Sequence, residues 1–499
     1  MDNLTESDKV NKLYSCYGIL ADCPPHEISQ KEDTYKHILM AVNGGEKEKR
    51  LACQFIPVFF KYFPGLADMA LDALFDLCED TDVAIRRQAI KELAIFCRDC
   101  VRYTKKVTMT LSQLLLVKDP TELRIVHAAL LSLFSIDTKA AIIGLFAQIR
   151  FGDDAIKDTC LRFLSLKMGD ICDEVMKNGG EELLMRKIMA TLREATLEDI
   201  PLLLKIALST RRARSIEGKQ ELGLALLSLL ESEGPFDPSN NERIQRLIIY
   251  LKHMHLLYSA GESLGCYKIV FYITEEVLPH FLAIPGCEEG VGYALEILQL
   301  LAEITSYADK IPNSEKAVSH VWKLLMEFVP ERPYEDKANL NLSYIEYLLF
   351  TLHRIIKFCP AVIEKDAEKL KRLRFRLKHV ALVVLGYCNH FGTIVDDKNA
   401  EASRDRARKR KWSLISNDLN NSESSSDSSP LKTIKWKEAS DWNSVERPND
   451  IPMCDSKRKH FKEVASDVCS NIIKLINDFF QDPMECTATV ELSSLLERS

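Results

Sequence analysis

The stretch from Glu79 to Leu93 constrains the fold more than any other part of this chain. An acidic turn leads into a segment whose apolar residues recur at helical spacing. Its signature residues are Asp82, Val83, Arg86 and Ala89. An acid at the turn caps the helix and complements its dipole, while a small residue lets a neighbouring helix approach closely. This pattern is typical of the second helix of a HEAT-type hairpin, and because one hairpin cannot bury its own apolar face, it predicts a stack.

The small-residue position recurs along the first 210 residues, where it can be followed through Cys53, Ala89, Ala129 and Cys160. Further helical periodicity without a clear repeat continues to about residue 395. We therefore predict an all-α fold with a HEAT-repeat N-terminal half over residues 10–212 and an armadillo-like C-terminal half over residues 213–395. Together these halves are expected to form an elongated α-solenoid.

The composition changes at about Val395. Residues 396–459 have little apolar periodicity and hold a basic cluster and an acidic serine tract, so we predict a disordered insertion. An apolar stripe from Phe461 to Phe479 predicts a helix over residues 460–482 that docks back on the second domain. Residues 483–499 are expected to form a flexible C-terminal tail.

Composition restricts the class of protein. The net charge of −7 argues against a nucleic-acid binder that uses its whole surface, although it permits a local basic patch. The polar N-terminal residues do not resemble a signal peptide, so the 15 cysteines are expected to be reduced thiols in an intracellular compartment. No apolar run is long enough for a membrane span, and no membrane association is expected.

Three N-terminal segments carry a recognisable pattern: Tyr17–Asp22, Gly44–Phe60 and Leu77–Leu93. They resemble the apoptosis inhibitor 5 family, and weaker similarity continues at Glu276–Pro279 and Leu298–Glu303. The resemblance implies a non-enzymatic, mainly nuclear scaffold that suppresses apoptosis through protein partners, such as the chromatin-condensation factor Acinus and a nuclear fibroblast growth factor. It also implies a link to messenger-RNA complexes. Animal members end in a basic Gly/Arg-rich tail that this sequence lacks, so RNA association is expected to be indirect.

The densest basic cluster lies inside the predicted insertion and consists of Arg404, Arg406, Arg408, Lys409, Arg410 and Lys411. A basic cluster in a disordered segment suits the groove of an importin, so we predict a nuclear localisation signal. A nucleic-acid patch or a merely solvated run of charge are the alternatives. The protein is expected in the nucleus, with some in the cytoplasm.

Two leucine patterns suggest docking motifs. Leu111, Leu114 and Leu115 form an LxxLL motif where the family has its own, and such a stripe can fill a partner's groove. The favoured interpretation is the core face of a repeat helix, because Val107 and Leu116 are expected to extend the stripe inward.

The family resemblance also suggests a leucine zipper at Leu370, Leu377 and Val384. Lysine and arginine interrupt the heptads there, so a buried helix is favoured.

Motifs of catalysis are missing from the sequence. Cys97 and Cys100 form a single CxxC without the second pair that a zinc site needs. We find no phosphate-binding or dinucleotide loop and no nucleophile elbow, so no enzymatic activity, metal or cofactor is expected. The preferred interpretation is a monomeric nuclear scaffold. The alternatives are a HEAT-type transport or assembly adaptor and an RNA-associated messenger-ribonucleoprotein factor.

Overall fold

The computed structural model describes residues 5–175, 179–259, 265–286, 292–308, 311–312, 314–329, 331, 340–360, 362, 367–395, 455–481, 484 and 486–492. Every regular element within these ranges is a helix, which confirms the all-α prediction. The fold separates into two compact units, one formed by Met1–Pro235 with Asn240–Leu264 and the other by Phe236–Ser239 with Gly265–Ser499. The expected boundary at 212/213 falls inside the first unit. The HEAT and armadillo assignments stay predictions.

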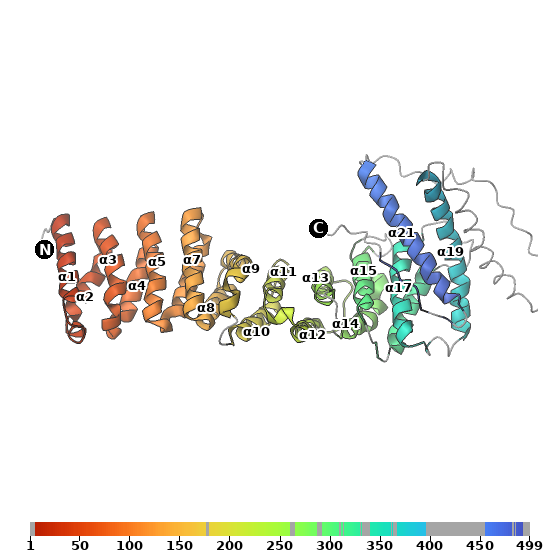
Figure 1. The fold of residues 1–499 in the computed structure, drawn as a ribbon, viewed down its shortest axis with the longest axis horizontal. Helices are drawn as coiled ribbons and strands as arrows, with labels where there is room; N and C mark the ends of the chain where they lie inside the picture. Colours follow the sequence, from red (N-terminus) through yellow and green to blue (C-terminus); the bar gives the residue numbers. More distant parts are fainter. Residues whose placement is uncertain are drawn as a thin grey trace, which may run out of the picture. The chain divides into compact units, whose positions relative to one another are not determined.

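The first unit is a stack of helical hairpins. Its α-helices are α1 (Glu6–Ala21), α2 (Glu32–Met40), α3 (Glu46–Phe59), α4 (Ala67–Cys78), α5 (Val83–Asp99), α6 (Thr104–Gln113), α7 (Pro120–Ile136), α8 (Thr138–Phe151), α9 (Asp154–Val175), α10 (Gly180–Leu192), α11 (Asp199–Leu208), α12 (Ile216–Ser232) and α13 (Asn241–Tyr258). Helices α1, α3, α5 and α7 stand side by side in one layer (Figure 1). Helices α6, α8 and α10 pack in sequence within the second layer.

Acidic N-caps tie successive helices of the first layer together. Asp82 caps α5 by accepting the amide hydrogen of Ala84 at 2.7 Å, while Arg50 of α3 donates to its other oxygen at 3.1 Å. Asp119 does the same for α7, since it accepts from the Glu122 amide and also from Arg87 of α5 at 2.9 Å. Each acid therefore satisfies free amides at a helix start and links that helix to the previous hairpin.

The caps also fix which residues are equivalent between repeats. Ala89 is the seventh residue after its N-cap, Asp82, and the seventh residues after Gly45 and Asp119 are Ala52 and Val126. Ala52 and Val126 are therefore the structural counterparts of Ala89, whereas the sequence-based trace chose Cys53 and Ala129. Ala52, Cys53, Val126 and Ala129 are all buried. Burial therefore does not distinguish the equivalent position from its neighbours, whereas the distance from the N-cap does.

The second unit is arranged around one buried helix. Its α-helices are α14 (Tyr267–Tyr272), α15 (Tyr293–Ser306), α16 (Glu315–Phe328), α17 (Leu342–Phe358), α19 (Ala367–Val395) and α21 (Asp455–Phe479). Helix α17 packs against α15, α16 and α21, and α21 also packs against α19. The face of α21 that does so carries Val468, Ile472, Leu475 and Phe479, all buried.

Among the described helices, none combines the length and the apolar character that a membrane crossing requires.

Candidate binding surface on the first unit

A groove lies between α5 and α7, and we call it the α5/α7 groove. Its floor is made of short side chains, because Ala94 and Ala129 are buried there. Longer side chains from both helices form the rims: Lys91, Ile95 and Arg98 from α5, and Arg124, Ile125 and Ala128 from α7. Ile95 is 41% exposed and so presents an apolar side chain at the rim. The groove therefore offers both apolar and basic contacts to a partner.

Within the part of the chain that the structure describes, the basic residues of the α5/α7 groove form no close ion pair, although the charge of Lys91 acts on the neighbouring Glu92. No carboxylate there lies within ion-pair distance of Lys91, Arg98 or Arg124. Among the described residues, the Arg124 guanidinium donates within its own helix, to the Pro120 carbonyl and the Thr121 hydroxyl, both at 3.3 Å. The groove thus retains net positive charge and can attract an acidic partner.

The neighbouring arginines on α5 have a different role. Arg86 donates two hydrogen bonds to the buried carboxylate of Glu122, at 2.9 and 3.1 Å, and also donates to the Asp80 carbonyl. Arg87 binds the cap of α7. The N-terminal turn of α5 therefore holds the repeats together, whereas its later turns present unpaired charge. The signature residues Asp82, Arg86 and Ala89 belong to the scaffold, and only Val83 among the signature is exposed.

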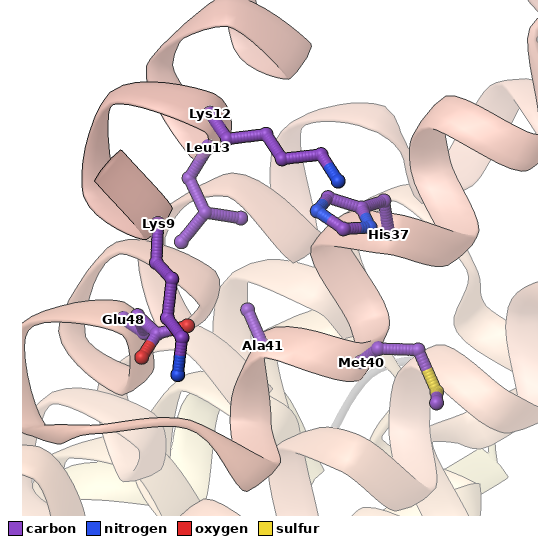
Figure 2. A pocket seen from close by; sticks show the side chains of 7 residues that line it. All are labelled: Lys9, Lys12, Leu13, His37, Met40, Ala41 and Glu48. Atoms are coloured by element: carbon purple, nitrogen blue, oxygen red, sulfur yellow. The ribbon is translucent and has the colours of Figure 1, made fainter. Parts of the chain in front are cut away.

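A second, smaller pocket lies between α1, α2 and α3 (Figure 2). Lys12 reaches toward His37 and Lys9 toward Glu48 (Figure 2). Glu48 is already used, because its carboxylate accepts the Gly45 amide hydrogen at 2.9 Å and caps α3. Burial, together with the charge of Lys12, lowers the pKa of His37. None of the seven lining residues is a serine, threonine or cysteine, so the pocket offers no hydroxyl or thiol nucleophile.

The LxxLL motif belongs to the core of the stack. Leu111 and Leu115 are buried and Leu114 is half-buried. Helix α6 ends at Gln113, and a 3₁₀ turn, η6 (Leu114–Leu116), follows. Val107 extends the buried stripe as expected, but the expectation for Leu116 was wrong, because Leu116 is 45% exposed. The tighter turn after α6 changes the helical register and rotates Leu116 outward.

The zipper-like residues also lie on a packed face. Leu377 and Val384 are fully buried and Leu370 is half-buried. Helix α19, which carries them, packs against α21 of its own unit. These leucines therefore have an intramolecular partner, in agreement with the favoured interpretation of a buried helix.

Burial makes Cys97 of the CxxC pair a poor nucleophile. Both thiols are free, and burial raises the pKa of Cys97 to about 12, so it is not a thiolate near neutral pH. Across the residues that the structure describes, no group of three metal-binding side chains comes together. The six basic residues from Arg404 to Lys411 lie outside the described residues.

Sequence reasoning did not find the α5/α7 groove. The available signal was the spacing of Lys91, Ile95 and Arg98, which share one face of a helix whose other face is apolar. That spacing identifies an exposed face of α5. It does not show that small side chains of α7 lie opposite this face and leave room for a groove.

Comparison with known proteins gives a consistent result. The family model described as apoptosis inhibitory protein 5 matches residues 10–495. The chain is 36% identical to apoptosis inhibitor 5 of Mus musculus over 413 residues, which is 81% of each chain. It is 36% identical to the Homo sapiens protein, covering 78% of it. It is 34% identical to the Drosophila melanogaster homolog over 409 residues, or 79% of this chain and 75% of that one.

Proposed function

The chain belongs to the apoptosis inhibitory protein 5 family, and from this premise we propose that it suppresses apoptosis by binding partner proteins on its helical stack. The observation that carries the proposal is the α5/α7 groove, with its exposed Ile95 and its unpaired basic rims. A binding surface of this kind needs no catalytic group, so the proposed activity is that of a scaffold and not of an enzyme.

The groove favours partners that are acidic and partly apolar. Opposite charge would steer a partner segment to Lys91, Arg98 and Arg124, while Ile95 and Ile125 would contact its apolar residues. The partners implied by family resemblance, Acinus-like and nuclear growth-factor-like proteins, are the first to test. We further propose a nuclear site of action with a cytoplasmic fraction, reached through importin.

The test reverses the charge of the groove. In cells lacking the protein, the double variant Lys91→Glu, Arg98→Glu should fail to restore survival after an apoptotic stimulus. The same variant should lose salt-sensitive binding to an acidic partner, because two attractive charges become repulsive. Normal survival in cells expressing this variant would refute the proposal.

A matched control changes the same charge elsewhere on the first unit. Arg193 and Lys205 are exposed and lie outside the groove. The variant Arg193→Glu, Lys205→Glu should protect cells as the unaltered chain does. Circular dichroism should show the same helix content for both double variants, so that loss of survival cannot be attributed to unfolding.

RNA is the second candidate ligand, because the same unneutralised charges could contact phosphates. Titration of the full chain with single-stranded RNA at several salt concentrations distinguishes the two. Tight binding with a steep salt dependence, lost in Lys91→Glu, Arg98→Glu, would favour the RNA-associated function over the protein scaffold.

A further inference from the structure

Residues 486–492 lie on the second unit in the manner of a bound peptide. The Thr487 and Ala488 amides reach Asp478 near the end of α21, and the Glu491 carbonyl reaches Asn471, two turns earlier. The segment therefore runs antiparallel to the last turns of α21. Cys486, Ala488, Val490 and Leu492 are half-buried, while Thr487, Thr489 and Glu491 are exposed. This alternation is that of an extended strand with one face against the protein.

The anchors of this segment bind its main chain. Asp478 Oδ2 accepts the amide hydrogens of Thr487 and Ala488, both at 2.6 Å. Asn471 Nδ2 donates to the carbonyl oxygen of Glu491 at 2.7 Å. The Thr487 hydroxyl adds a longer hydrogen bond to Asp478 Oδ1, at 3.5 Å. Because every peptide carries the main-chain groups, the three shorter anchors do not require a particular sequence. They resemble the way in which other domains hold extended peptides by their backbone.

The anchors are also held from the other side, by α17. His353 Nε2 lies 2.9 Å from Asp478 Oδ2, and Asn471 Nδ2 donates to Glu346 Oε1 at 2.7 Å. His353 and Glu346 both come from α17, and all four side chains are buried. Asp478 and Asn471 are thus fixed by α17 and lose little freedom when they bind a peptide.

We propose that this face of α21 is a docking site for extended peptides, which the chain's own residues 486–492 occupy here. The partner is an extended segment of another protein with small apolar residues at alternate positions, as in Cys486, Ala488, Val490 and Leu492. The tethered segment competes with this partner at a high effective concentration and so limits access to the site. This inference is independent of the α5/α7 groove, because it concerns the other unit.

The first experiment uses the full chain with Val490→Asp and Leu492→Asp, which disfavour the inward face of the segment and leave α17 and α21 unchanged. A fluorescent peptide of residues 484–492 should bind this variant saturably. It should bind the unaltered chain at least tenfold more weakly, because the tethered segment competes.

Peptides methylated on one backbone nitrogen test the anchors. Methylation at Ala488 removes a hydrogen bond to a charged acceptor and should weaken binding about tenfold or more. Methylation at Thr489, whose amide is not among the two that reach Asp478, should leave affinity within about twofold of the parent. Equal affinity of the Ala488-methylated peptide, or no binding of the parent, overturns the proposal.

A second measurement does not depend on the folding of the variant. Burial raises the pKa of Cys486 to about 11, which slows its alkylation. Excess peptide added to the unaltered chain should displace the segment and accelerate alkylation of Cys486, followed by mass spectrometry. An unchanged rate contradicts the proposal. If the chain forms dimers that require residues 486–492, the site binds this segment of a second copy of the chain. That result would overturn the proposal that the partner is another protein.

Discussion

At the residue scale, Arg86 and Arg87 show how burial decides the energetic weight of similar ion pairs. Both side chains come from the first two turns of α5, and both bind an acid at the start of α7. The partner of Arg86, Glu122, is 2% exposed, whereas Asp119, the partner of Arg87, is 46% exposed. Water can solvate Asp119 after its partner is removed, but it cannot reach Glu122 without rearrangement.

Arg86→Ala is therefore expected to destabilise the first unit by about 2 kcal/mol, because it leaves the Glu122 carboxylate buried and unpaired. Arg87→Ala is the control and should have a much smaller effect. Urea unfolding followed by circular dichroism measures both. A double variant, Arg86→Ala with Glu122→Gln, should recover part of the loss, and an Arg86→Ala effect no larger than that of Arg87→Ala would contradict the assignment.

His353 makes the second unit sensitive to acid. Burial lowers the pKa of His353, an effect that Asp478 opposes and that Arg354 and Lys357 reinforce. The unfolded chain then binds a proton near the ordinary histidine pKa of about 6.5, while the folded chain binds it only at lower pH. Protonation consequently favours unfolding, and stability falls as the pH decreases below about 6.5.

The variant His353→Gln should lose less stability than the unaltered chain as the pH falls below about 6.5. The comparison is between slopes, since the substitution also changes the hydrogen bond to Asp478 at every pH. Urea midpoints measured between about pH 7.5 and 5 for the two proteins provide the test. If both proteins lose stability with the same slope, His353 is not the group responsible.

At the element scale, the packing of α6 against α8 depends on one glycine. A Cβ at Gly144 would lie 2.7 Å from the Lys105 carbonyl oxygen and 2.9 Å from Thr108 Cβ, so the two helices would have to separate. Gly144→Ala should therefore cost about 1–3 kcal/mol. In α9, Gly169 has no neighbouring atom within 4 Å of such a Cβ, and Gly169→Ala should stabilise the chain by about 0.5–1 kcal/mol. Thermal unfolding of both variants compares them directly, and stabilisation by Gly144→Ala would show that the interface tolerates a wider spacing.

Periodicity in the sequence identifies the inner face of an element but not its partner. The expected stripe of α21 is buried from Val468 to Phe479, and Leu377 and Val384 of α19 are buried as well, since these positions recur at helical spacing. Asn471 and Asp478 lie beside the apolar stripe of α21 and leave its spacing intact. Nothing in the sequence connects them with Glu346 and His353, which are 125 residues away. These pairings exist only because α17 and α21 pack together.

At the scale of the whole molecule, the basic cluster from Arg404 to Lys411 is proposed to direct the protein to the nucleus. Lys409→Ala, Arg410→Ala and Lys411→Ala together should abolish nuclear accumulation, because importin grooves recognise clustered positive charge. Fluorescence microscopy of the tagged full chain provides the measurement. The matched control replaces Lys187, Arg193 and Lys205 by alanine and should remain nuclear, and persistence of the first variant in the nucleus would exclude the cluster as the import signal.

The sequence by itself determined the helical class, the repeat signature around Asp82 and Arg86, and the family, because these depend on local spacing and on residue identity. The tertiary structure decided what local spacing cannot encode. It showed that Asp82 and Asp119 each serve two helices, that Ala52 and Val126 are the counterparts of Ala89, and that alanines opposite Ile95 open a groove. Each of these facts depends on which helices meet, and that is set by packing over distances that periodicity does not reach.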